Sequence, residues 1–259
     1  MRAPLWVDTD LALGAARGDV DDGFALAAVV LAGAELLGVS AVSGNTDAAT
    51  AYGCARDLLD VLGAGCPVVP EADAPAALAA LPAGASVLAI GPPGNLLRAA
   101  ALDPGWPARV EVRVVGRVRS RLRHPLLPLF DLNLGGREAR RLWSAPFSRL
   151  SVFPLDVVRR LRLDGRDLER LRGLGPAGEY LARHSRRWLA RAPLRYLARS
   201  FPAWDLVAAL DAVGRLPGAR FDRRLGRSGL AGFDVAGARA AFFALPWPAA
   251  SPASPAERR

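Results

Sequence analysis

Carboxylates are concentrated in one short stretch near the N-terminus, between an apolar strand end and an apolar helix. Residues 6–26 read WVDTDLALGAARGDVDDGFAL, and the aspartates in this stretch are Asp8, Asp10, Asp19, Asp21 and Asp22. Like charges a few ångströms apart cannot all stay ionised without compensation. A hard divalent cation supplies it, and Ca²⁺ accepts about six to eight oxygen ligands. The stretch therefore indicates a metal site at the end of the first strand.

A structural interpretation of part of this stretch is also open. Asp19 could cap the helix that follows, because aspartate is a favoured N-cap residue. Asp21 and Asp22 would then lie in the first turn, where the helix dipole favours negative charge. This interpretation leaves Asp8 and Asp10 at the strand end unexplained, so the metal site is the stronger hypothesis.

The order of apolar runs predicts strands that alternate with helices. The predicted strands are 5–7, 36–42, 68–69, 86–90, 110–115 and 150–153. The first predicted helix begins at Phe24, and the others cover 46–62, 74–81, 95–101, 137–143 and 205–213. Residues 159–199 show the spacing of amphipathic helices with arginines on their solvated faces. We therefore expect an α/β fold that is Rossmann-like, with a mostly parallel central sheet and helices on both faces.

Polar motifs stand where several of the predicted strands end. Ligands of open α/β sheets bind at the carboxyl ends of the strands. The acidic stretch, Ser43-Gly44-Asn45 and the turn 91–95 all fall at such ends. The sequence therefore predicts that these motifs meet at one edge of the sheet and form the binding site.

The length and composition of the chain limit its possible domain organisation and location. With 259 residues, of which 51% are hydrophobic, the chain can bury a core, and we expect a single domain over 1–245 followed by a disordered tail over 246–259. No apolar run approaches the ~20 residues of a membrane span, and the chain enters its first strand without room for a signal peptide. Cys54 and Cys66 lack metal-site spacing, so we expect free thiols and a cytoplasmic protein without membrane contact.

The charge balance raises a different hypothesis. A net charge of +9 and a pI near 11.0 are typical of nucleic-acid-binding proteins. However, every basic residue is arginine, and alanine, glycine and proline are also abundant throughout. This pattern indicates a compositional bias of the source genome more than a binding surface, so we expect no nucleic-acid partner.

Taken in order, the motifs resemble those of the inosine–uridine-preferring nucleoside hydrolase family over most of the chain. Asp8-Thr9-Asp10 followed by Asp21-Asp22 is similar to the family's aspartate signature, and 42–45 (VSGN) to its second strand-end motif. Residues 90–95 (IGPPGN) resemble its Gly-Pro-Leu-Thr-Asn turn, 131–133 (DLN) its Glu-Phe-Asn motif and 154–157 (PLDV) its Pro-Leu-Asp-Val segment. Trp204-Asp205 stands where the family has His-Asp.

The resemblance implies a Ca²⁺-dependent hydrolase that cleaves the N-glycosidic bond of purine or pyrimidine ribonucleosides in nucleoside catabolism and salvage, commonly as a homo-oligomer (dimer or tetramer). Asp10 would be the general base and a metal ligand. The other metal ligands would be Asp22, Asp205 and the backbone carbonyl of Ile90. The substrate-binding residues would be Asp21, Asn45, Asp131 and Asn133 on the ribose and Trp204 on the base.

The chain also departs from the family pattern. The family connects its aspartate groups by fewer residues than the ten, 11–20, that intervene here, and its histidine- and glycine-rich loop is missing before Ser86. Asp131 replaces a glutamate and Trp204 a histidine. An alternative is therefore a catalytically impaired member that binds a ribosyl ligand or a protein partner.

Several of the site residues also have structural interpretations. Asn45 could be a turn residue in the left-handed region, Asn133 a loop cap, Asp205 the N-cap of its helix and Trp204 a core anchor. For His124 and His184, which could act as leaving-group acids, we favour surface or structural roles.

Overall fold

The computed structural model describes residues 3–15, 18–119, 126, 133, 141–142, 144–224 and 227–248. The strands are β1 Leu5–Thr9, β2 Leu36–Ala41, β3 Val68–Val69, β4 Ser86–Ala89, β5 Glu111–Val115, β6 Arg149–Phe153, β7 Arg162–Asp164, β8 Ser200–Pro202, β9 Arg220–Arg224 and β10 Arg227–Gly232. The helices are α1 Asp21–Leu31, α2 Ala48–Leu62, α3 Ala74–Ala79, α4 Gly94–Leu102, α5 Trp106–Arg109, α7 Leu155–Val158, α8 Gly165–Arg172, α9 Gly175–Tyr196, α10 Trp204–Ala212 and α11 Val235–Phe243.

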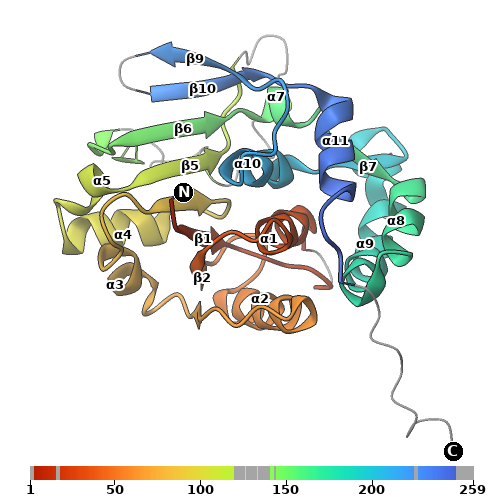
Figure 1. The fold of residues 1–259 in the computed structure, drawn as a ribbon, viewed down its shortest axis with the longest axis horizontal. Coiled ribbons are helices and arrows are strands. Elements are labelled where there is room, and N and C mark those ends of the chain that lie inside the picture. The colour runs from red at the N-terminus through yellow and green to blue at the C-terminus, as the bar shows by residue number, and fades with distance from the viewer. Residues whose placement is uncertain are drawn as a thin grey trace, which may run out of the picture.

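The main sheet has eight strands in the order β3-β2-β1-β4-β5-β6-β10-β9 (Figure 1). Its neighbouring strands are parallel except for β10 and β9, which form an antiparallel pair at one edge. The order 3-2-1-4-5-6 is that of a Rossmann fold, so the predicted fold class is confirmed. A separate small sheet pairs β7 with β8 in antiparallel fashion.

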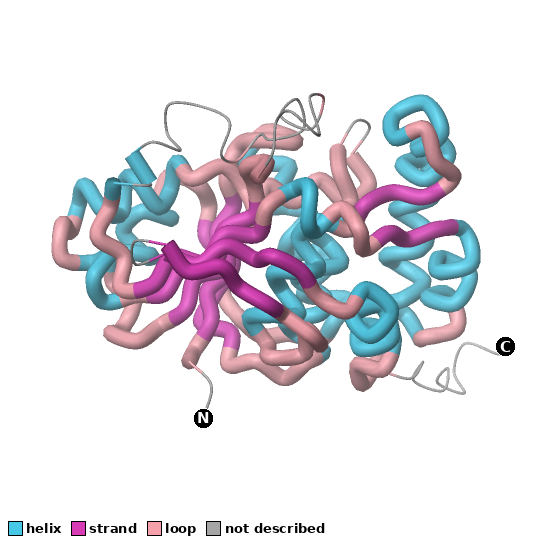
Figure 2. The backbone as a smooth tube through the Cα atoms, turned by 90° about the horizontal axis from the view of Figure 1, so that it is seen from above, coloured by secondary structure: helices cyan, strands magenta, loops and turns pink. Residues whose placement is uncertain are grey.

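Side chains that alternate along the strands build a core on each face of the sheet. In β1, Val7 packs into the core that contains α1, α10 and α11, whereas its neighbour Trp6 packs with Leu78 of α3, Leu96 of α4 and Trp106 of α5. This follows from the two-residue period of a strand, which sends successive side chains to opposite faces. Figure 2 shows helices on both sides of the twisted strands.

Helices α1 and α10 lie side by side against the central strands (Figure 1). Every residue of α1 except Val30 is buried, as are the first seven residues of α10, from Trp204 to Leu210. Helices that are apolar on all faces are stable only inside a core. Burial of both helices therefore brings the acidic first turn of each to the same edge of the sheet.

The sequence predicted the ends of most helices and strands to within about two residues of where the structure has them. Helix α2 begins after Asp47, whose side chain accepts from Thr50 N at 2.8 Å, and ends at Gly63, whose φ of +67° is easy only for glycine. The prediction that 159–199 is entirely helical is wrong, because this segment contains strand β7 besides α8 and α9. Pairing with β8, distant in sequence, overrides the helical pattern at that point.

Some predicted elements lie partly or wholly outside the described residues. Of the predicted helix 137–143, only 141–142 is described, and both residues are helical. The expected disordered tail is described only as far as residue 248, and Trp247 packs edge-on against Phe242 with ring centroids 5.3 Å apart. The strands β9 and β10 and the helix α11 had no sequence prediction.

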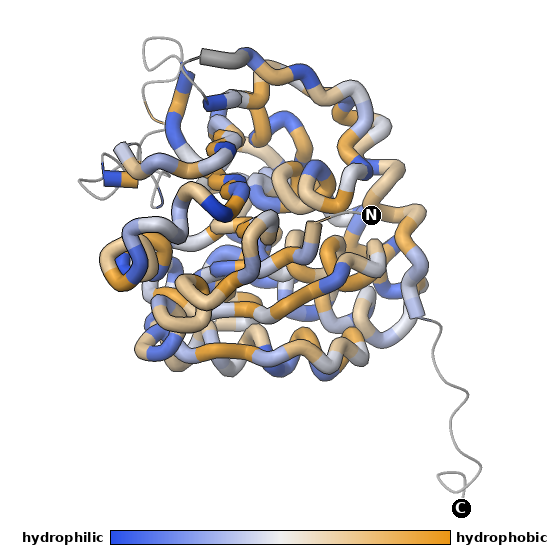
Figure 3. The backbone as a smooth tube through the Cα atoms, turned by 60° about the vertical axis from the view of Figure 1, so that its left-hand side comes forward, coloured by the Kyte–Doolittle hydropathy of each residue, from blue (hydrophilic) through white to orange (hydrophobic). Residues whose placement is uncertain are grey.

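Hydrophilic and hydrophobic residues alternate along the peripheral helices, as Figure 3 shows. Within the described part of the chain, no helix has both the length and the apolar character that crossing a membrane demands.

Candidate active site

Asp10 lies directly after β1, at the carboxyl edge of the sheet. Its side chain is 1% exposed. Oδ2 accepts a hydrogen bond from the backbone N–H of Asn45 at 2.6 Å, whereas Oδ1 has no hydrogen-bond donor among the described residues. A buried carboxylate oxygen without a donor is costly unless a cation binds it. The acidic stretch and the Ser43-Gly44-Asn45 motif therefore meet at Asp10, as predicted.

Glycines allow two strand-end loops to approach Asp10 closely. A Cβ on Gly44 would stand 2.1 Å from Asp10 Oδ2, and a Cβ on Gly91 would stand 2.9 Å from the backbone nitrogen of Asp10. Neither distance is compatible with a side chain. The absence of a Cβ at these positions is what lets the loops after β2 and β4 close around the carboxylate.

The first turns of α1 and α10 bring three further aspartates together. One carboxylate oxygen from each of Asp21, Asp22 and Asp205 lies within 4.8 Å of the others. The backbone N–H of Asp205 donates to Asp21 Oδ2 at 3.2 Å, and the hydroxyl of Thr9 donates to Asp22. Asp10 also lies within hydrogen-bonding reach of Asp22, so these aspartates form one continuous group.

The interpretations of Asp19 and Asp205 as helix N-caps are wrong. The N-cap of α1 is Val20, without a side-chain hydrogen bond, and Asp19 accepts instead from Val20 N at 2.7 Å. The N-cap of α10 is Ala203, so Asp205 does not occupy that position. Asp21 and Asp22 do lie in the first turn of α1.

Burial and mutual repulsion perturb these carboxyl groups strongly. Burial raises the pKa of Asp10 to about 6, against a usual value of 3.8. The pKa values of Asp21, Asp22 and Asp205 are raised well above the usual range, first by burial and then by the neighbouring carboxylates. A divalent cation removes both penalties, because it replaces lost water and offsets the charge. The donor set, all carboxylate oxygen, fits a hard cation such as Ca²⁺.

Asp8 and Asn95 connect the strand ends around the site through hydrogen bonds. Asp8 Oδ1 accepts from Asn95 Nδ2 at 2.8 Å and from the hydroxyl of Ser40, and burial raises the pKa of Asp8 to about 7. Asn95 Nδ2 also donates to the carbonyl of Ala41 at 3.0 Å. Asn95 thus ties the turn after β4 to β1 and β2. Sequence reasoning gave Asn95 no role, although its position at the end of the glycine-rich turn was visible.

Asn133 lies at the ends of β4 and β5. Its Nδ2 donates to the carbonyl oxygen of Ile90 at 2.6 Å and to that of Val115 at 3.3 Å. The structure therefore brings together a predicted ribose ligand and the backbone carbonyl predicted to bind metal. A carbonyl oxygen has two lone pairs, so the Ile90 carbonyl can accept from Asn133 and still bind a cation. Asp131 and His124 lie outside the described residues.

The remaining predicted residues differ in their surroundings. Asn45 is half-buried, and its φ is not positive, since only Arg117 and Leu197 among the described non-glycine residues have a positive φ. The left-handed interpretation of Asn45 is therefore wrong. Trp204 is 7% exposed and packs in the core, which leaves little of its ring for stacking on a base.

His184 occupies a structural position. Its ring lies 4.3 Å, centroid to centroid, from that of Tyr180, and a Cβ on Gly14 would stand 2.3 Å from its Nδ1. Burial and the charge of Arg183 lower the pKa of His184, while Asp57 raises it. The charged groups that act on His184 thus differ from the aspartates of the site, which agrees with the structural role that we favoured.

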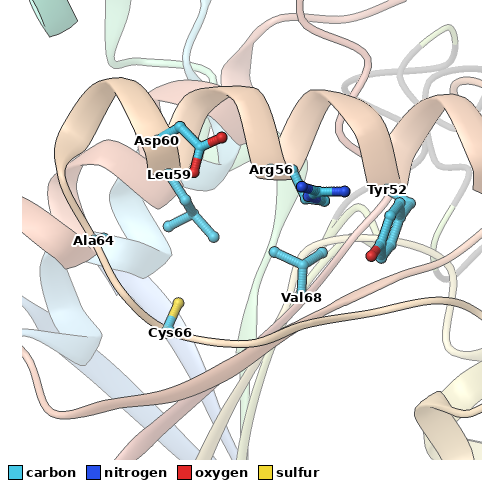
Figure 4. A pocket seen from close by; sticks show the side chains of 7 residues that line it. All are labelled: Tyr52, Arg56, Leu59, Asp60, Ala64, Cys66 and Val68. Atoms are coloured by element: carbon cyan, nitrogen blue, oxygen red, sulfur yellow. The ribbon is translucent and has the colours of Figure 1, made fainter.

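The cysteines are free and half-buried, as expected. Cys66 lines a small hollow of about 110 Å³ between α2 and the segment leading into β3 (Figure 4). The side chains around it are Tyr52, Arg56, Leu59, Asp60, Ala64, Cys66 and Val68. Ligand pockets usually measure about 300–1,000 Å³, so this hollow is too small for a nucleoside.

Comparison with known proteins identifies the fold. No protein-family model and no curated protein sequence matches the chain. A plant nucleoside hydrolase matches with a TM-score of 0.77 and 16% identity, covering 95% of this chain and 99% of that one. The inosine-uridine preferring nucleoside hydrolase from Bacillus anthracis gives 0.67 and 14%, with 95% and 99% covered. The type III effector protein XopQ, complexed with adenosine diphosphate ribose, gives 0.65 and 15%, with 95% and 94% covered. The chain therefore has the fold of the nucleoside hydrolases, as the motif resemblance predicted.

Proposed function

We propose that this protein is a Ca²⁺-dependent hydrolase that cleaves the N-glycosidic bond of ribonucleosides, giving ribose and a free base. The observation that carries the proposal is the buried aspartate group at the carboxyl edge of a nucleoside hydrolase fold, with Asp10 Oδ1 lacking a donor within the described chain. Buried carboxylates with strongly raised pKa values are typical of functional sites. We further propose a cytoplasmic protein that works as a homo-oligomer in nucleoside salvage.

Asp10, Asp22, Asp205 and the Ile90 carbonyl would hold the cation. When bound, the cation compensates the carboxylate charges and lowers the pKa of a coordinated water. Asp10 is the proposed general base, because the hydrogen bond from the Asn45 backbone N–H fixes its carboxylate and burial raises its pKa, which favours taking a proton from water. The oxygen of the water adds to the anomeric carbon of the ribose while its proton goes to Asp10, and the N-glycosidic bond breaks with its electrons leaving on the base. The base then takes up a proton from solvent, and Asp10 releases its proton to solvent.

Asp21 and Asn45 would bind the ribose hydroxyls, together with Asn133 and Asp131. Asp21 accepts from the backbone N–H of Asp205, and Asn45 is only half-buried. Hydrogen bonds to the sugar that strengthen as positive charge develops on the ring lower the barrier to cleavage. Trp204 would contact the base only with the small exposed part of its ring.

A second candidate is a catalytically impaired protein that binds a ribosyl ligand. Two observations favour it: Trp204 fills the position where a histidine would serve as leaving-group acid, and the matched effector protein XopQ has adenosine diphosphate ribose bound. This candidate predicts ligand binding without turnover.

One experiment separates the two candidates. Purified protein is incubated with Ca²⁺ and a panel of purine and pyrimidine nucleosides, and free base is quantified by HPLC, with adenosine diphosphate ribose binding followed by calorimetry. Release of base above the rate of the Asp10→Asn variant supports the hydrolase. Binding of a ribosyl ligand without any release of base would select the second candidate.

A further inference from the structure

The loop after β2, which carries Asn45, is held at two points by side chains from other parts of the chain. The carbonyl oxygen of Ala41, the last residue of β2, accepts from Asn95 Nδ2 at 3.0 Å. Two residues further on, the hydroxyl of Ser43 donates to Glu71 Oε2 at 2.7 Å. Glu71 lies between β3 and α3, and Asn95 lies in the first turn of α4. Two segments distant in the sequence therefore hold this loop.

Arg98 of α4 joins these two attachments. Its Nη2 donates to Glu71 Oε1 at 3.0 Å and to Asn95 Oδ1 at 2.7 Å. Because the guanidinium binds Oδ1 of Asn95, the Nδ2 of the same amide is turned to its acceptors, Asp8 Oδ1 and the carbonyl of Ala41. One guanidinium group thus orients both of the side chains that hold the loop.

The position of this loop sets the surroundings of the Asp10 carboxylate. The backbone N–H of Asn45 donates to Asp10 Oδ2 at 2.6 Å, and Gly44 N donates to the carbonyl of Thr46 at 2.9 Å within the loop. A displaced loop would therefore displace the donor that fixes the proposed general base. A misplacement of about 1 Å at a reacting group can cost about 10²-fold in rate.

The ion pair between Arg98 and Glu71 is poorly suited to a purely stabilising role. The side chains are 52% and 26% exposed, and pairs in contact with water add little to the stability of a fold. We propose that Arg98 is a positioning residue, which acts through Glu71 and Asn95 to hold the loop after β2 and, through this loop, the Asp10 carboxylate. This inference rests on the proposed function, because it concerns the same general base.

Three substitutions separate positioning from stability. Arg98→Met keeps the aliphatic stem but removes both hydrogen bonds. Arg98→Lys can restore them, because both leave from a single nitrogen and an ammonium group has three N–H donors. Arg149→Met is the matched control, since Arg149 is 54% exposed and pairs with Glu111 at 3.2 Å. That pair lies at the amino ends of β5 and β6, the edge of the sheet opposite the site.

The first measurement needs neither substrate nor cation. Hydrogen exchange of the Asn45 backbone amide, the donor to Asp10, is followed by NMR in metal-free protein. We expect exchange about tenfold or more faster in Arg98→Met, and within about twofold of the wild type in Arg149→Met, because exchange reports local opening of the loop. Equal exchange in the wild type and Arg98→Met would overturn the inference, whether or not the protein is a hydrolase.

The second measurement is kcat/KM for release of base in the presence of Ca²⁺. Arg98→Met should lower it about tenfold or more, Arg98→Lys should recover it to within about threefold of the wild type, and Arg149→Met should leave it unchanged. Both methionine variants should change the melting temperature by a similar, small amount, since each loses one exposed ion pair.

The outcomes distinguish the inference from the proposed function. If the wild type releases base and Arg98→Met does so equally fast, the inference is overturned while the proposed hydrolase stands. If the wild type releases no base, the proposed function is overturned, and hydrogen exchange at Asn45 then decides whether Arg98 holds the loop.

Discussion

At the scale of single residues, Asp10 is the group on which the proposed chemistry depends. One of its oxygens accepts from Asn45 N at 2.6 Å, and the other has no hydrogen-bond donor among the described residues. Burial makes it a better base than an ordinary aspartate, because the pKa of a buried carboxyl group rises. The residue thus combines a fixed position with a raised proton affinity.

Substituting Asp10 by asparagine tests this role. Asp10→Asn keeps the shape and one oxygen but cannot accept the proton from water. We expect kcat for nucleoside hydrolysis to fall by about 10²-fold or more, the scale of a general base. The melting temperature without metal should not fall, because a repulsive charge is removed. Activity within threefold of the wild type would show that another group activates the water.

Trp204 stands where the nucleoside hydrolase motif has a histidine, and this substitution bears on the proposed expulsion of the base. A purine departs more easily when a nearby acid protonates it, and the indole of Trp204 cannot supply that proton. We therefore expect slow hydrolysis of inosine and faster hydrolysis of p-nitrophenyl riboside, whose leaving group departs as an anion. Trp204→His should increase kcat/KM for inosine more than for the activated substrate.

Two observations would contradict this account of the leaving group. Equal wild-type kcat/KM values for the two substrates would mean that an acid is already present, and His124 is the first residue to replace. The second is a Trp204→His variant that keeps its melting temperature but changes both substrates by the same factor.

At the scale of elements, close approach of the loops after β2 and β4 holds Asp10 in place. The Cβ of Gly44→Ala would stand 2.1 Å from Asp10 Oδ2 and 2.8 Å from Pro92 Cδ. Because the loop cannot accept the methyl group without moving, we expect Ca²⁺ affinity and kcat/KM to fall by about tenfold or more. Calorimetric titration with Ca²⁺ measures the first and base release the second.

Gly53→Ala is the matched control for this prediction. Gly53 lies inside α2, and a Cβ there meets nothing within 4 Å. The same added methyl group should leave cation binding unchanged and stabilise the helix by about 0.5–1 kcal/mol. Equal effects of the two substitutions on Ca²⁺ affinity would disprove the role of the close approach.

The sequence predicted the helices and strands well, but it predicted the contacts between their side chains poorly. Strand ends and the cap of α2 follow from local signals, so β1, β2 and α2 lie close to their expected ranges. That Val20 and not Asp19 is the N-cap of α1 could not be predicted locally, because an aspartate before a helix has the sequence signature of a cap whether or not its side chain accepts from the helix. Likewise, Asn95 contacts Asp8 of β1 and Gly44 contacts Asp10 directly after β1. These partners are distant in the chain, so no local pattern encodes the contacts.

At the scale of the whole molecule, the buried carboxyl groups make stability depend on pH and on the cation. The pKa of Asp10 is raised to about 6 and that of Asp8 to about 7. Folded protein therefore binds protons that the unfolded chain has already lost, so this contribution is complete below the unfolded values near 3.8 and is lost as pH rises through the folded ones.

We therefore expect the melting temperature of metal-free protein to fall between about pH 5 and about pH 8. Over this range the carboxylates with lowered pKa values, such as Asp103, remain ionised and contribute little change. Added Ca²⁺ should raise the melting temperature most at the upper end, because the cation binds the ionised form. Differential scanning fluorimetry in EDTA and in Ca²⁺ measures both curves. A metal-free melting temperature that increases steadily over this range would contradict the electrostatic account.

One assay tests directly whether the protein hydrolyses ribonucleosides with the help of a bound cation and Asp10. Protein stripped with EDTA is given a ribonucleoside, with and without Ca²⁺, and free base and ribose are quantified by HPLC alongside Asp10→Asn. The account predicts stoichiometric base and ribose from wild-type protein with Ca²⁺, at least about 10²-fold faster than from the variant. Base release at the same rate in EDTA, or from Asp10→Asn, would contradict it.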